Sequence, residues 1–168
     1  IPNPYRPGEV SVFKDWRKQG WVDFYDAIAV SANVYFYLIG GGYQDQRGLG
    51  ADRIKRYASS FGLGAKLGID LFGEESGFIP DPESKKKTNP ENPIWRIGDT
   101  YNISIGQGGV RVTPLQMAAA TAAIANGGKL YRPRLLASVI NTNDEVAAGH
   151  NGPQLIREVM ISQETLRH

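Results

Sequence analysis

Residues 113–128 read TPLQMAAATAAIANGG, and this stretch carries the clearest fold signal in the chain. Thr113 can cap a helix, Pro114 suits the first helical position, and Gln116 completes a capping box by reaching back to the cap. We therefore predict a helix from there to about Ala125, where an Asn-Gly-Gly sequence stops it. Because the helix is rich in alanine, neighbours can approach it closely, and we expect it to be buried on more than one side.

Upstream, two predicted helices meet at a Ser-Ala-Asn sequence. The pattern of residues 23–30 predicts a first helix capped by Asp23. A second helix is expected to begin near Ser31 or Asn33, both good cap residues, and to stop at the glycines of 40–42. The S-x-N sequence is therefore expected at a helix-to-helix corner.

The remaining segments predict a few further elements. Residues 51–61 predict a third helix, whereas residues 63–104 are rich in glycine and proline and predict a long, irregular, packed loop. Within that loop, Lys85-Lys86-Lys87 is interpreted as a solvated run. Residues 135–140 predict a buried strand and residues 155–161 another. We expect this segment to be mainly α with a few C-terminal strands.

The composition is that of an ordinary globular domain. The chain has 168 residues, of which 41% are apolar and 21% charged, and its net charge of +2 is too small to predict nucleic acid as a partner. The absence of cysteine excludes disulfides and thiolate metal sites, and the only histidines are His150 and His168, so we expect no metal and no cofactor. The longest apolar stretch, residues 27–39, is too short to span a membrane.

Two motifs allow more than one interpretation from the residues alone. In serine acyl transfer a hydroxyl can relay the proton of the nucleophile while a carboxamide holds the substrate amide, and Ser31 and Asn33 could do this together. The alternative is that one of them simply caps the following helix. Gly106-Gln107-Gly108 could cradle a phosphate, but the Walker lysine and the third glycine of a dinucleotide fingerprint are missing, so a tight turn is the better interpretation.

The order in which these segments follow one another resembles a known family. Residues 22–37, which contain Ser31-Ala32-Asn33, are similar to the S-x-N helices of class B penicillin-binding proteins. Further similar segments follow in the family's order at Phe61-Gly62-Leu63-Gly64, Gly68-Ile69-Asp70-Leu71, 74–80, Gly98-Asp99-Thr100, 104–109 and 113–128. The resemblance covers about residues 5–140 and looks closest to penicillin-binding protein 2, the cell-elongation type.

This resemblance implies an α/β fold, with a central antiparallel sheet flanked by helices, in which residues 1–168 form an internal segment of one transpeptidase domain. It implies a bacterial peptidoglycan D,D-transpeptidase that cross-links stem peptides through an acyl-serine and binds β-lactams without a cofactor. The implied partners are the rest of the domain and cell-wall elongation proteins, and the implied location is the periplasmic face of the inner membrane.

The resemblance also assigns site residues. Ser31 would act in proton relay and Asn33 would place the substrate, so both would be catalytic, and Gln107 would add to substrate binding near the cleft wall. The family's other two motifs are a nucleophilic S-x-x-K serine and a K-T-G strand. We expect the chain to contain neither, with the first motif shortly upstream of Ile1 and the second shortly downstream of His168.

Three alternatives stay open. A β-lactamase of related fold would be smaller and would lack the match at residues 113–128. A β-lactam sensor domain would share the motifs but would signal rather than cross-link. A non-catalytic scaffold segment would come from a gene that lacks S-x-x-K altogether.

Overall fold

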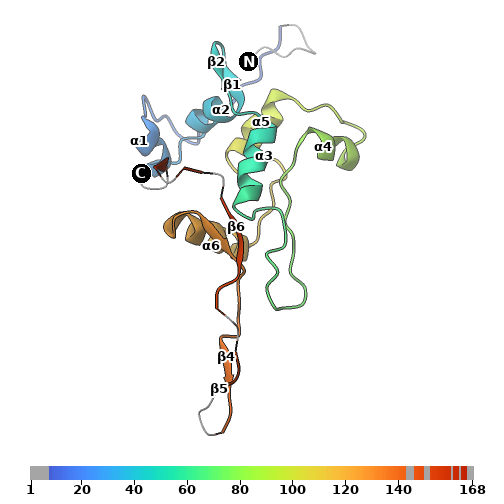
Figure 1. Ribbon diagram of the computed structural model, residues 1–168. Helices are drawn as coiled ribbons and strands as arrows, with labels where there is room; N and C mark the ends of the chain where they lie inside the picture. The colour runs from blue at the N-terminus through green and yellow to red at the C-terminus, as the bar shows by residue number, and fades with distance from the viewer. Residues whose placement is uncertain (1–7, 143–145, 150–151, 160, 163, 166–168) are drawn as a thin grey trace.

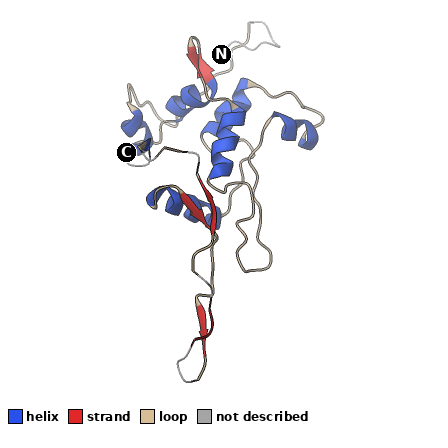
Figure 2. Ribbon diagram, viewed as in Figure 1, coloured by secondary structure: helices blue, strands red, loops and turns tan. Residues whose placement is uncertain are grey.

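The computed structural model describes residues 8–142, 146–149, 152–159, 161–162 and 164–165. Figure 1 shows a helical body from which a narrow hairpin arm extends. The helices are α1 (Phe24–Ala29), α2 (Asn33–Gly41), α3 (Ala51–Ser60), α4 (Pro82–Thr88), α5 (Ile97–Ser104) and α6 (Pro114–Ala125). The strands are β1 (Gly42–Tyr43), β2 (Gln46–Arg47), β3 (Lys129–Tyr131), β4 (Ser138–Ile140), β5 (Val146–Gly149) and β6 (Leu155–Glu158). The prediction of a mainly helical segment with C-terminal strands is confirmed (Figure 2).

The helices predicted at 23–30 and 51–61 are confirmed within the usual uncertainty of helix ends. The Asp23 carboxylate accepts a hydrogen bond from the Asp26 amide at 2.8 Å and so caps α1 as expected. The α3 helix ends at Ser60 with Phe61 as its C-cap, and Gly62 follows with a φ of +85°, a left-handed conformation that glycine adopts without penalty.

Glycine lets α2 and α5 pack in close contact. A Cβ added at Gly40 would lie 1.7 Å from the Ser104 Oγ, and one at Gly41 would lie 2.3 Å from a ring carbon of Tyr101. No side chain fits at such distances, because protein interiors are already close-packed. The Tyr101 hydroxyl donates to the Gly42 carbonyl at 2.6 Å and ties α5 to the end of α2. The glycines predicted as a helix stop therefore also form a packing surface.

The expectation of an irregular loop over residues 63–104 is wrong, because α4 and α5 lie within it. A capping box between Asp81 and Ser84 starts α4. Asp81 also pairs with the Lys55 ammonium of α3 at 2.5 Å. Burial by itself would raise the pKa of Asp81, but the hydrogen bonds from Lys55 and Ser84 outweigh burial and lower the pKa to about 2. These polar contacts compensate for a segment with few apolar residues.

The lysine run is not a solvated loop, because it forms the last turn of α4. Lysines suit that position, where the helix dipole favours positive charge. The Lys85 ammonium pairs with Asp99 at 2.6 Å and lies 5.9 Å from the centre of the Trp95 ring. Lys86 and Lys87 are exposed, so the interpretation holds for their side chains but not for Lys85.

The capping box of α6 is confirmed. Thr113 accepts from the Gln116 amide at 3.1 Å, and the Gln116 side chain accepts from the Thr113 amide at 3.1 Å. Gln116 is buried and its side-chain amide also donates to the carbonyls of Ala65 and Ser76, at 2.7 and 2.9 Å. One glutamine thus completes the capping box of α6 and fixes the segment between α3 and α4 against it.

Burial of α6 on more than one side is not observed. One side of the helix packs on a small core formed by Leu67, Ala123, Leu130 and Val159. The opposite side leaves Met117 and Ile124 about half exposed. Among the described residues, the expectation is therefore wrong, because the buried residues Gln116, Ala120 and Ala123 lie on one side of the helix.

The strands form antiparallel pairs: β1 with β2, β3 with β6, and β4 with β5. The strand predicted at residues 135–140 is shorter, Ser138–Ile140, and it is not buried, since Leu135, Leu136 and Val139 are exposed. It belongs to the hairpin arm at the bottom of Figure 1, where no other element covers it. The strand predicted at 155–161 is confirmed as the shorter β6.

Candidate functional site

The S-x-N sequence forms the turn between α1 and α2. The turn closes by backbone hydrogen bonds from the Ser31 amide to the Ile28 carbonyl, at 3.2 Å, and from the Ala32 amide to the Ala27 carbonyl, at 2.9 Å. Ser31 has a φ of +54° and so lies in the left-handed region. Asn33 is the first residue of α2. The predicted helix-to-helix corner is therefore confirmed.

Neither motif residue caps α2. The N-cap is Ala32, which has no side chain that could accept a hydrogen bond. Ser31 is exposed and Asn33 is half-buried, and neither side chain has a hydrogen-bond partner among the described residues. The interpretation of either residue as a simple helix cap is therefore wrong, and both polar groups remain available to a ligand.

A segment earlier in the chain supplies hydrogen-bond partners for the start of α2 and for the turn before it. The Asp15 carboxylate accepts from the Val34 amide in the first turn of α2 at 3.2 Å. The Trp16 indole N–H donates to two backbone carbonyls, those of Val30 at 3.2 Å and Ser31 at 3.1 Å. We call residues 15–19 the bracing segment. Sequence reasoning missed these residues, since 14 to 19 positions separate each of them from its partner.

The left-handed Ser31 is a strained position. A serine in this region costs of order 1–3 kcal/mol and persists where the surroundings determine the backbone. Here the two turn hydrogen bonds and the bracing segment supply that support. Since such strain gathers at functional sites, the observed outlier supports a functional role for the corner.

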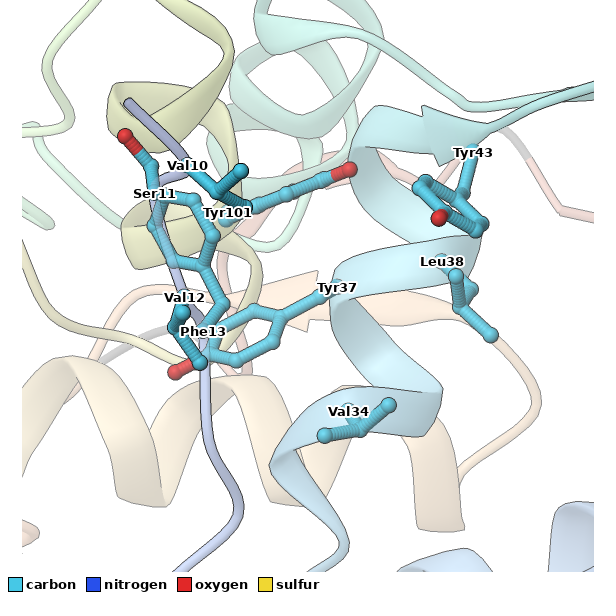
Figure 3. A pocket seen from close by; sticks show the side chains of 9 residues that line it. All are labelled: Val10, Ser11, Val12, Phe13, Val34, Tyr37, Leu38, Tyr43 and Tyr101. Carbon is cyan, nitrogen blue, oxygen red and sulfur yellow. The ribbon is translucent and has the colours of Figure 1, made fainter. Parts of the chain in front are cut away.

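An open cavity of about 300 Å³ lies beside the first turns of α2. Figure 3 shows residues 10–13 along one side of this cavity and α2 along the other. The lining is mainly apolar and aromatic, formed by Val10, Ser11, Val12, Phe13, Val34, Tyr37, Leu38, Tyr43 and Tyr101. The Phe13 ring packs edge-on against Tyr101, with centroids 4.9 Å apart, and so attaches the N-terminal segment to the helices.

Two tyrosines of this cavity, Tyr37 and Tyr101, have raised pKa values. Burial, helped by the nearby Asp15 carboxylate, raises the pKa of Tyr37. Burial and Tyr43 raise the pKa of Tyr101. Both phenols therefore stay protonated at neutral pH, and their hydroxyls serve as hydrogen-bonding groups.

Gln107 lies in the turn that follows α5. Its amide donates to the Asn102 carbonyl at 2.9 Å, and the flanking Gly106 and Gly108 have φ values of +73° and +68°, as a tight turn requires. The side chain of Gln107 is exposed. No hydrogen bond among the described residues joins it to Ser31 or Asn33. A role in substrate binding stays a prediction.

The expectation that the chain contains no S-x-x-K spacing is wrong, because two such spacings occur. Ser11 and Lys14 lie in a segment without helical structure, so the lysine is not one helical turn from the serine. Ser84 and Lys87 lie on α4, but the Ser84 hydroxyl is committed to Asp81 in the capping box. An activated serine needs a base within hydrogen-bond reach, and neither pair provides one in this structure.

Among the described residues, no group of three or more potential ligands could hold a metal ion. No helix within the described ranges is both long and apolar enough to cross a membrane.

Comparison with known families identifies the chain's relatives. A family model described as the penicillin binding protein transpeptidase domain matches residues 2–168. The peptidoglycan D,D-transpeptidase MrdA of Acinetobacter baumannii is 39% identical over 132 residues, which cover 77% of this chain and 18% of the relative. MrdA of Escherichia coli K12 is 34% identical over 142 residues, which cover 83% of this chain and 21% of the relative. The chain therefore spans about a fifth of the length of these relatives.

Solved structures agree with this result. PBP2 from Helicobacter pylori superposes with a TM-score of 0.73 at 32% identity, covering 94% of this chain and 27% of that one. PBP2 of Pseudomonas aeruginosa, solved in complex with WCK 5153, gives 0.75 at 30% identity, covering 96% of this chain and 33% of that one. The expected α/β transpeptidase fold and the likeness to penicillin-binding protein 2 are confirmed. The chain belongs to the penicillin-binding protein transpeptidase family.

Proposed function

We propose that this chain is an internal segment of a bacterial peptidoglycan D,D-transpeptidase, which cross-links stem peptides through an acyl-serine intermediate and is acylated by β-lactams. The observation that carries the proposal is the family match over residues 2–168, with the S-x-N corner inside it. The curated relatives are named peptidoglycan D,D-transpeptidases, and the related PBP2 of Pseudomonas aeruginosa was solved in complex with WCK 5153.

Within this enzyme, Ser31 relays the proton that the nucleophile loses, and Asn33 holds the substrate amide. An unpartnered hydroxyl can accept one proton while donating another, and a carboxamide offers one acceptor and two donors to a peptide. The support is geometric: the two residues flank one turn, and their polar groups are not engaged by the protein. Gln107 would contact substrate from the turn after α5, a role that its exposed side chain permits.

The nucleophilic serine, its lysine base and the K-T-G strand come from parts of the domain beyond residues 1–168. This proposal is supported by the two S-x-x-K spacings of the chain, which lack the geometry of an activated serine. It is also supported by the relatives, which are several times longer than the matched segment. The exposed face of α6 around Met117 and Ile124 is a surface that the remaining domain would cover.

The cellular setting follows from the same proposal. The enzyme would act on the periplasmic face of the inner membrane, anchored outside this segment, and would help to set cell shape. One structural relative was solved as a complex of PBP2 and MreC from Helicobacter pylori. A cell-wall elongation complex is therefore the proposed partner class.

Labelling with a fluorescent penicillin tests the proposal. The full protein encoded with this segment should give one covalent band that survives denaturation, whereas residues 1–168 alone should give none, because activation is what turns a hydroxyl into a nucleophile. Unlabelled penicillin added first should remove the band. Stoichiometric labelling of the isolated chain, or no labelling of the full protein, would contradict the proposal.

A further inference from the structure

We propose that Asp15 and Trp16 are positioning residues of the transpeptidase site, which act through the backbone to hold Ser31 and Asn33 in their working arrangement. The inference rests on the proposed function. It goes beyond that function because the S-x-N motif contains neither residue. What carries it is the set of hydrogen bonds that the bracing segment makes to both sides of the corner.

The start of α2 depends on Asp15. The first amides of a helix have no partner within it, and Ala32 at the N-cap offers none. Asp15 Oδ2 accepts from the Val34 amide at 3.2 Å, one residue after Asn33. Its Oδ1 accepts from the Trp16 amide at 2.8 Å, which fixes the orientation of the carboxylate. A negative charge at this end also interacts favourably with the helix dipole.

The end of α1 depends on Trp16. Carbonyls at the end of a helix lack partners within it. The indole N–H donates to the carbonyls of Val30, the C-cap of α1, and of Ser31, the next residue. The guanidinium of Arg17 lies 4.5 Å from the centre of the indole ring and holds it in place. The Trp16 side chain thus binds the carbonyl of the left-handed serine and the carbonyl of the residue before it.

We infer that these contacts determine the direction in which the Ser31 hydroxyl points. A left-handed serine can relax to an ordinary conformation if its neighbouring peptides are free to rotate, and that rotation would carry the hydroxyl away from the reacting atoms. Displacements of about 1 Å can reduce a rate by about 10². Trp16 restrains the peptides on both sides of Ser31, so its loss should slow the chemical step rather than weaken binding.

The test uses the full transpeptidase and penicillin acylation measured by stopped flow. Trp16→Phe keeps the ring but removes the indole donor, and it should lower the acylation rate constant at saturating penicillin by about 10- to 100-fold. The binding constant and the final labelled fraction should not change. Trp95→Phe is the matched control, because it removes an indole hydrogen bond of 2.8 Å to Thr100 of α5, and it should acylate at the wild-type rate.

A second pair of variants separates positioning from folding. Asp15→Ala should slow acylation and speed hydrogen exchange at the Val34 amide. Asp15→Asn keeps an acceptor oxygen and should restore most of both. A merely structural role would lower the thermal midpoint and the labelled fraction but leave the rate constant of the labelled molecules unchanged.

The possible outcomes are distinct. If the wild-type enzyme is labelled and Trp16→Phe acylates at its rate, the inference is overturned and the proposed function stands. If Trp95→Phe slows acylation as much as Trp16→Phe, the effect is general and the inference is again overturned. If the wild-type enzyme is never labelled, the proposed function fails and the inference fails with it.

Discussion

Replacement of Ser31 by alanine and by glycine separates catalysis from structure at the corner. The hydroxyl has no partner among the described residues, so its removal in Ser31→Ala should change the free energy of unfolding by no more than about 0.5 kcal/mol. Ser31→Gly removes the left-handed penalty of about 1–2 kcal/mol. The greater freedom of the unfolded glycine chain offsets about 0.4–1 kcal/mol of that gain, so this variant should be as stable as the wild type or slightly more stable.

Both variants should acylate slowly in the full enzyme. Loss of a positioned proton-transfer group reduces a rate by about 10² to 10⁴, and neither variant can relay a proton at this position. Stopped-flow acylation by penicillin gives the rate constant, and thermal melts give the stability. Ser84→Ala is the matched control, since it breaks the α4 capping box and should lose about 1 kcal/mol of stability without slowing acylation. Acylation by Ser31→Ala at the wild-type rate would refute the proton-relay argument.

Two further variants test the packing and the electrostatics of the helical body. Gly40→Ala should destabilise the chain by about 1–3 kcal/mol, because its Cβ would overlap Ser104, and Ser104→Gly in the same chain should recover part of the loss in urea unfolding. Asp81 has a pKa lowered from 3.8 to about 2, so the stability it contributes is complete above about pH 4 and is lost as the pH falls through 2. Asp81→Asn should therefore be less stable at neutral pH and should lose less stability than the wild type between pH 4 and pH 2. Equal acid sensitivity of the two proteins would show that the pair with Lys55 does not act in this way.

The sequence by itself determined the elements whose signals are local. Capping boxes and helix stops are recognised from residues three or four apart, and α6 is therefore capped by Thr113 and Asn126 as expected. The S-x-N corner was also predictable, because the ends of two helices bracket it. Family membership followed from the order of several such segments, which no single motif would have supplied.

Only the tertiary structure decided what holds the corner. The contacts of Asp15 and Trp16 join residues 14 to 19 positions apart, and no periodic pattern in the sequence indicates them. The left-handed Ser31 was not predicted either, since serine has no preference for that conformation, which the turn hydrogen bonds after α1 and the contact from Trp16 support together. The helices within residues 63–104 are short and their stabilising contacts are not local: α4 has no buried residue and is held by polar contacts such as Lys85 with Asp99, and α5 buries Tyr101 and Ile103 against distant elements. The spacing of apolar residues indicates which side of a single helix or strand is buried. It does not indicate which elements pair, because that depends on how the chain folds back on itself.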